Sequence, residues 1–132
     1  MTRDRGSVSI LFAAGLTAII MIIGLSVDGG GRLRAAQRAQ DVAAEAARAG
    51  GQAVDVARVL AGGPRQLDPA AAETAVQDYL RAAGATGSAD ISDDLRHVTV
   101  HVTLVYHTRM LSLVGIATLT VAATATAALV ST

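Results

Sequence analysis

An uncharged, strongly apolar run near the N-terminus constrains this chain more than any other feature. No charged residue lies between Arg5 and Asp28, so the run from Gly6 to Val27 is 22 residues long. As an α-helix it would rise about 1.5 Å per residue, enough to cross the roughly 30 Å hydrocarbon core of a bilayer. We therefore predict a transmembrane helix over residues 7–28, preceded by a charged leader, residues 1–6.

Two other interpretations of this run are weaker. A helix buried on all sides inside a soluble protein needs apolar surface around it, and the rest of the chain offers too little. A cleaved signal peptide would fit the basic residues Arg3 and Arg5, but residues 25–29 lack a small-x-small cleavage pattern. The run is also long for the hydrophobic region of a signal peptide. A retained membrane anchor is the favoured interpretation.

The charges that flank the run do not fix its orientation. The basic residues near its ends are Arg3 and Arg5 on one side and Arg32, Arg34 and Arg38 on the other. Asp4 and Asp28 offset one charge on each side. The count of basic residues leans, if anything, away from a cytoplasmic N-terminus. Both orientations stay open on charge alone.

Composition narrows the class of protein. A chain of 132 residues fits one domain with an appendage, and its formal net charge is zero, so no global field attracts nucleic acid. Cysteine is absent, which excludes disulfides, thiolate metal sites and cysteine nucleophiles. The aromatic residues are few (Phe12, Tyr79 and Tyr106), so a large rigid core is not expected.

The segment after the run is rich in good helix formers and predicts a helix over about residues 32–61. Small residues recur along one face in steps of four and three. This helix-packing stripe consists of Ala36, Ala43, Ala47, Gly50, Val54 and Ala57, with Gln40 and Ala61 on the same line. Small side chains allow close approach of this chain's own sheet or of a neighbouring subunit. Continuous with the apolar run, the helix would extend from about Val8 to Ala61, with a bend at Gly29–Gly31 or Gly50–Gly51.

A second helix and a sheet should follow. Asp68 and Pro69 are an N-cap and a first helical residue, and Gly84 is a stop signal, so a helix is predicted over about residues 69–83. After Asp94 the apolar period changes from 3.6 to 2, which predicts strands. The uncharged tail from Met110 could form a second membrane helix, but its threonines alternate with apolar residues as in a strand.

With a third strand near residues 89–91, these signals predict an antiparallel sheet over about residues 89–130. The fold class is therefore α+β, with a long N-terminal transmembrane helix, a second short helix and a small C-terminal antiparallel sheet.

No residue pattern predicts catalysis or a bound metal. His97 and His101 would lie about 13 Å apart on a strand, too far to share one ion. Asp90, Asp93 and Asp94 lack the spacing of a calcium loop and are typical of turns. No serine nucleophile elbow or phosphate-binding loop is recognisable. We expect no enzyme activity, no cofactor, no small-molecule substrate and no nucleic-acid partner.

The layout as a whole resembles the TadE/TadG-like proteins of tight-adherence (Flp-type) pilus systems, which look like type IV pseudopilins. The resembling segments are RDRGSVSILFA and GLSVDGGGRLRAAQRAQDVAAEAA and, more loosely, VTVHVTLVYHT and IATLTVAATATAAL. The resemblance implies cleavage by a prepilin peptidase between Gly6 and Ser7. It also implies that residues 1–6 lie in the cytoplasm and that residues 29–132 form an extracytoplasmic pilin-like domain.

The resemblance further implies a single-pass protein of the cytoplasmic (inner) membrane that can reach the cell surface within a pilus. Its partners would be the lipid bilayer, other pilin-like subunits and the Tad secretion machinery. One departure is Leu11, which occupies the fifth position of the cleaved chain, where pilins usually carry Glu. We therefore predict a subunit that stays uncut or sits at a pilus end.

The sequence thus predicts a membrane-anchored pilin-like subunit that assists assembly of a Flp/Tad-type, type IV-like adhesion or secretion pilus. The alternative is a membrane-tethered exported binding module with no pilus role. The helix-packing stripe should separate the two, because an assembly subunit needs close helix contacts with neighbours and a simple tether does not.

Overall fold

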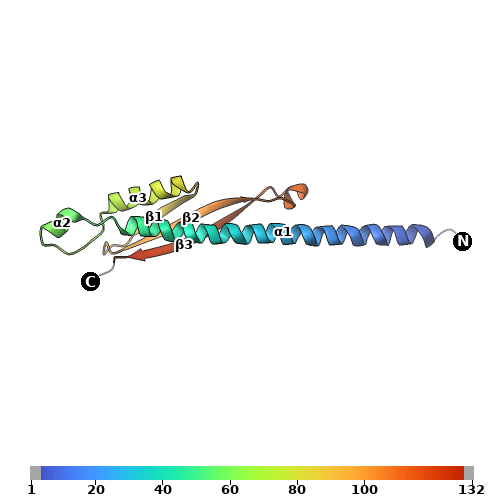
Figure 1. Ribbon diagram of the computed structural model, residues 1–132, viewed down its shortest axis with the longest axis horizontal. Helices are drawn as coiled ribbons and strands as arrows, with labels where there is room; N and C mark the ends of the chain where they lie inside the picture. Colours follow the sequence, from blue (N-terminus) through green and yellow to red (C-terminus); the bar gives the residue numbers. More distant parts are fainter. Residues whose placement is uncertain (1–3, 130–132) are drawn as a thin grey trace. The chain divides into compact units, whose positions relative to one another are not determined.

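The computed structural model describes residues 4–129, with side chains described from Gly6 onward. The helices and strands are labelled in Figure 1: α1 (Asp4–Gly51), α2 (Val56–Leu60), α3 (Pro69–Ala82), β1 (Thr86–Ile91), β2 (His97–His107) and β3 (Thr118–Ala128). A 3₁₀ turn, η1 (Leu111–Val114), lies between β2 and β3. The predicted α+β class is confirmed. Arg3 of the predicted leader and the last predicted sheet residue, Val130, lie outside the described residues.

The chain divides into two compact units. The first joins the N-terminal part of α1, as far as Leu33, to the segment Tyr106–Leu119. The second contains, among the described residues, 34–105 and 120–129. The first unit therefore holds the apolar run and the β2–β3 loop, and the second holds α2, α3 and most of the sheet.

The three strands form one antiparallel sheet in the order β1-β2-β3. In the register of β1 and β2, Ile91 lies opposite Val98 and Ala89 opposite Val100. On the other face, the hydroxyl groups of Thr99 and Thr126 are 2.9 Å apart across β2 and β3. The apolar residues share one parity and the threonines the other, so the predicted alternation is confirmed.

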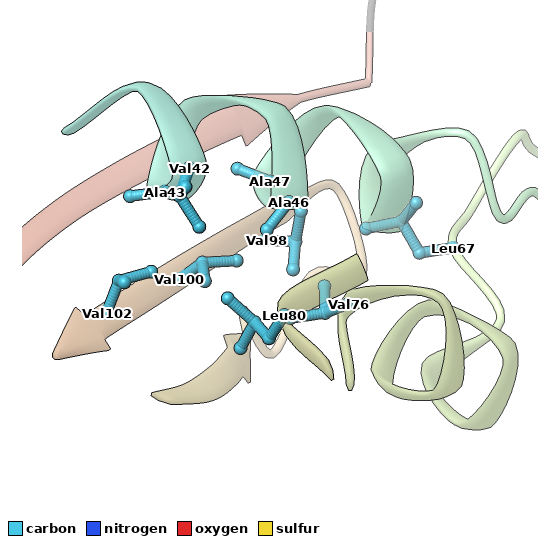
Figure 2. Close-up of a cluster of buried hydrophobic side chains, with 10 residues drawn as sticks. All are labelled: Val42, Ala43, Ala46, Ala47, Leu67, Val76, Leu80, Val98, Val100 and Val102. Atoms are coloured by element: carbon cyan, nitrogen blue, oxygen red, sulfur yellow. The ribbon is translucent and has the colours of Figure 1, made fainter. Parts of the chain in front are cut away.

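The core of the second unit is a small-residue core between α1, α3 and β2. Figure 2 shows Ala46 and Ala47 of α1 and Val76 and Leu80 of α3 gathered against the valines of β2. The buried side chains of this cluster are Val42, Ala43, Ala46, Ala47, Leu67, Val76, Leu80, Val98, Val100 and Val102. Because alanine side chains are small, the backbone of α1 lies close to the sheet. The cluster is therefore filled without aromatic side chains.

The course of α1 corrects the predicted end of this helix, and it separates the two glycine positions at which a bend was predicted. The helix passes through Gly29–Gly31 without interruption, and it ends at Gly51 rather than near residue 61. Beyond Gly51, Val54 forms an antiparallel bridge with Leu67, and the Asp68 amide donates to the Ala53 carbonyl at 2.8 Å. Two successive glycines weaken the helix, and this backbone pairing satisfies the polar groups that a longer helix would have used.

The later elements follow their local signals. The carboxylate of Asp68 accepts the amides of Ala70 and Ala71, Pro69 opens α3, and Gly84 has a φ of +66° after the helix. The tail from Thr118 to Ala128 is a strand, so the alternative of a second membrane helix is excluded for these residues.

Candidate functional site

Most of the apolar run of α1 lies on the surface of the protein. Every side chain from Gly6 to Ile23 is exposed, including Phe12 at 78% and Ile22 at 66%. The helix that contains the run is long and apolar enough to cross a membrane. An exposed apolar surface of this extent is stable only when lipid or another protein covers it.

A buried aspartate lies directly after the run. Only 1% of the Asp28 surface is exposed. Its Oδ1 accepts the backbone amide of Arg109 at 2.8 Å, and its Oδ2 accepts those of Met110 and Leu111 at 3.0 and 2.6 Å. The Tyr106 hydroxyl donates a long hydrogen bond of 3.5 Å to Oδ1.

These hydrogen bonds fix the β2–β3 loop to α1. The 3₁₀ turn η1 has no side-chain cap from Met110, the residue at its N-cap position. Asp28 takes this role from across the chain, because its carboxylate accepts the amides that begin the turn. A negative charge is favourable at the start of a helical turn, where unpaired amides point outward.

Two glycines on the same face of α1 make room for the loop. Gly24, Asp28 and Gly31 are spaced by four and three residues, so they share one face of the helix. A Cβ atom at Gly24 would lie 3.2 Å from the Met110 Cβ, and one at Gly31 would lie 1.9 Å from the Tyr106 hydroxyl oxygen. Gly31 therefore allows Tyr106 to reach α1, rather than loosening the helix.

The residues of the helix-packing stripe fall into three groups. Ala43, Ala47 and Gly50 are buried in the core of the second unit, and Ala36 is half-buried. Val54 and Ala57 lie beyond the end of α1. The predicted stripe did not include Ala39, Val42 and Ala46, which are buried as well.

Gly6 and Ser7, the predicted cleavage residues, are exposed, and so is His101, which the sequence did not predict as a metal ligand. Gly6 and Ser7 lie in the first turns of α1, and a Cβ at Gly6 would meet nothing within 4 Å. His101 is exposed on β2, with its Nε2 3.3 Å from Asp90 and its Nδ1 2.9 Å from the Thr124 hydroxyl. Residues 4–129 contain no group of three His, Cys, Asp or Glu side chains placed to hold a metal ion.

A comparison with protein-family models matches the N-terminal part of the chain. Residues 6–53 match the model named Tad, described as "Putative Flp pilus-assembly TadE/G-like". This segment is TadE/G-like. Neither the curated proteins nor the solved structures include a significant match to the chain.

The TadE/G-like segment contains the whole exposed apolar run and also Gly24, Asp28 and Gly31. The match supports a role related to Flp pilus assembly. The partners of Asp28 lie outside the TadE/G-like segment, on the β2–β3 loop and, for Tyr106, on β2.

Sequence reasoning missed the site around Asp28. The only local signal was an acidic residue directly after an apolar run, within the face formed by Gly24 and Gly31. Its hydrogen-bond partners are 78 to 83 residues away in the chain, so no periodicity connects them.

Proposed function

We propose that the chain is a membrane-anchored pilin-like subunit that assists assembly of a Flp/Tad-type, type IV-like adhesion or secretion pilus. The observation that carries this proposal is the TadE/G-like segment, residues 6–53, whose apolar run is exposed from Gly6 to Ile23. In a membrane the same surface would contact acyl chains, and in a pilus it would contact the apolar helices of other subunits.

The proposed topology is single-pass in the cytoplasmic membrane. Residues 1–6 would lie in the cytoplasm, and residues 29–132 would form the extracytoplasmic domain. The family resemblance supports this orientation, which the flanking charges leave open. The Tad secretion machinery and other pilin-like subunits are the proposed protein partners.

The surface used for assembly must differ from the one expected from sequence. Ala43, Ala47 and Gly50 are covered by this chain's own α3 and β2, so they are not available to a neighbouring subunit. The stripe therefore does not separate an assembly subunit from a simple membrane tether. The exposed apolar run remains as the assembly surface.

Membrane anchoring can be tested by placing charge in the run. The double variant Ile19→Arg/Ile22→Arg should leave the membrane fraction, because each arginine at the centre of a spanning helix costs about 2.5–3.5 kcal/mol. The matched control is Val56→Arg/Leu60→Arg, which adds the same charge to exposed apolar positions of α2. The control should remain in the membrane fraction.

The pilus role requires a second experiment in the source bacterium. Deletion of the gene should abolish or strongly reduce Flp-type pili, and a tagged chain should co-purify with the Tad secretion machinery. Normal piliation in the deletion strain, with the intact chain still membrane-bound, would instead support the membrane-tethered binding module.

A further inference from the structure

The β2–β3 loop presents an unusual amount of apolar surface. From Met110 to Ile116, here called the apolar loop, the sequence MLSLVGI contains no charged residue. Leu113 is 80% exposed and Val114 is 67% exposed. Exposed neighbouring apolar residues on a tightly held turn indicate a surface that contacts something apolar.

The apolar loop is held beside the end of the apolar run. Both lie in the first compact unit. The Met110 side chain packs at Gly24, and the loop amides bind Asp28. Gly24 is three residues before Val27, so this contact lies about 5 Å inside the end of the uncharged run.

The backbone amides of residues 110, 111, 113, 115 and 116 in the apolar loop have acceptors within the protein. Asp28 accepts the amides of residues 109–111. The amides of Leu113, Gly115 and Ile116 donate to carbonyls within the loop, at 3.0 to 3.2 Å. A segment that enters a lipid environment needs this internal pairing, because no water replaces a missing partner there.

Charged residues border the apolar surface. Arg109 precedes the loop, and Arg32 follows Asp28 by one turn of α1; both side chains are exposed. Basic residues beside an apolar surface are typical of segments at a membrane interface, where they contact anionic headgroups.

We infer that the apolar loop is a second membrane-contacting element, in which Leu113 and Val114 enter the boundary between lipid headgroups and acyl chains beside α1. The inference rests on the proposed anchoring of α1 in a membrane. Lipid is the occupant because the loop extends the surface of the apolar run at the depth where that run ends. Asp28 then has a defined task, since it holds the loop at this depth.

The absence of cysteine allows a direct test of depth. Single-cysteine variants of the full chain are labelled with bimane and reconstituted into phosphatidylcholine–phosphatidylglycerol vesicles at low protein density. The test positions are Leu113→Cys and Val114→Cys. Leu16→Cys in the run serves as the deep control, and Leu60→Cys, which is 83% exposed on α2, serves as the aqueous control. Iodide reports access from water, and lipids with a shallow nitroxide report contact with the headgroup boundary.

The expected result is several-fold weaker iodide quenching at Leu113 and Val114 than at Leu60, with strong quenching by the shallow nitroxide lipid. If Leu16 is shielded but Leu113 is quenched by iodide as strongly as Leu60, the inference is wrong and the anchor stands. Shielding at Leu113 that appears only at high protein density would assign the loop to a second copy of the chain and overturn the lipid contact. Iodide access at Leu16 would overturn the anchor and the inference together.

Discussion

Replacement of the Asp28 carboxylate by an amide tests whether this side chain holds the β2–β3 loop. In Asp28→Asn, an NH2 group replaces one of two oxygens that accept the amides of Arg109, Met110 and Leu111. At least one buried donor loses its acceptor, so we expect a loss of about 1–3 kcal/mol of stability in this unit. Hydrogen exchange should accelerate at the amides of residues 109–111.

The matched control for this prediction is Asp41→Asn, which makes the same chemical change at an exposed position of α1. It should leave exchange in the loop unchanged. Unaltered protection of the Arg109–Leu111 amides in Asp28→Asn would show that the loop keeps its place without the carboxylate.

Gly50 and Gly51 give a second comparison between single residues. A Cβ at Gly50 would lie 2.8 Å from the Val76 Cγ2 and 3.4 Å from the Ala72 carbonyl oxygen. A Cβ at Gly51 would meet its nearest neighbour, Ala127, at 3.4 Å. Gly50→Ala should therefore destabilise the second unit by about 1–3 kcal/mol through overpacking. Gly51→Ala should be neutral, or stabilising by up to about 1 kcal/mol through helix propensity.

Thermal unfolding of the two variants side by side checks this difference. Equal melting temperatures would mean that α1 and α3 can separate slightly without cost. The sequence predicted Gly50 as a position of close contact, but it did not identify Val76 and Ala72 as the partners, because α3 follows a turn whose direction no local signal gives.

At the scale of elements, α1 is continuous through Gly29–Gly31. We predict that substitutions at the adjacent glycines Gly30 and Gly31 have different effects. A Cβ at Gly31 would collide with the Tyr106 ring, whereas one at Gly30 would meet nothing within 4 Å. Gly31→Ala should therefore push Tyr106 away from Asp28 and expose it to solvent. Gly30→Ala should leave Tyr106 in place and stabilise α1 by up to about 1 kcal/mol.

Tyrosine fluorescence can report this change because the chain contains no tryptophan. In a Tyr79→Phe background, iodide should quench Tyr106 more strongly in Gly31→Ala than in Gly30→Ala. Equal quenching would indicate that Tyr106 is not held against the helix.

The turn between β1 and β2 should depend on pH. The Ser92 hydroxyl and the Arg96 backbone amide donate to the Asp94 carboxylate, and they hold the pKa of Asp94 below its usual value near 3.8. A lowered pKa in the folded state means that the charged carboxylate stabilises the turn above the usual pKa. This contribution disappears as the pH falls through the lowered value. The melting temperatures of the parent and of Asp94→Asn should therefore converge between about pH 5 and pH 2. A difference that does not change with pH would contradict this role for the carboxylate.

Elements with local signals were predictable, and contacts between distant segments were not. The Asp68 cap, the alternation in β2 and β3 and the stop at Gly84 depend on residues close together in sequence. The end of α1 depends instead on the pairing of Val54 with Leu67. This pairing interrupts the predicted helix after Gly51, and only Val56–Leu60 of the remaining predicted helix is helical, as α2.

At the scale of the whole molecule, the two compact units differ in what covers their apolar side chains. The second unit is covered by its own small-residue core, with alanines of α1 packed on β2 and α3. The first unit exposes the apolar run and the apolar loop together. The proposed functions follow this division, since the second unit needs no partner to bury its core, whereas the first requires lipid or another subunit.

Processing of the N-terminus is the remaining prediction at this scale. Cleavage after Gly6 would place the new amine of Ser7 at the start of the apolar run, where an unpaired charge costs several kcal/mol. A glutamate four residues later could pair with that amine, but Leu11 cannot. We therefore expect the chain to remain uncut or to occupy a pilus end, rather than to repeat along a pilus. N-terminal sequencing of the membrane and sheared-pilus fractions would decide between these cases. The prediction would be wrong if the chain began at Ser7 and formed the main component of sheared pili, because the amine would then have found a carboxylate on another subunit.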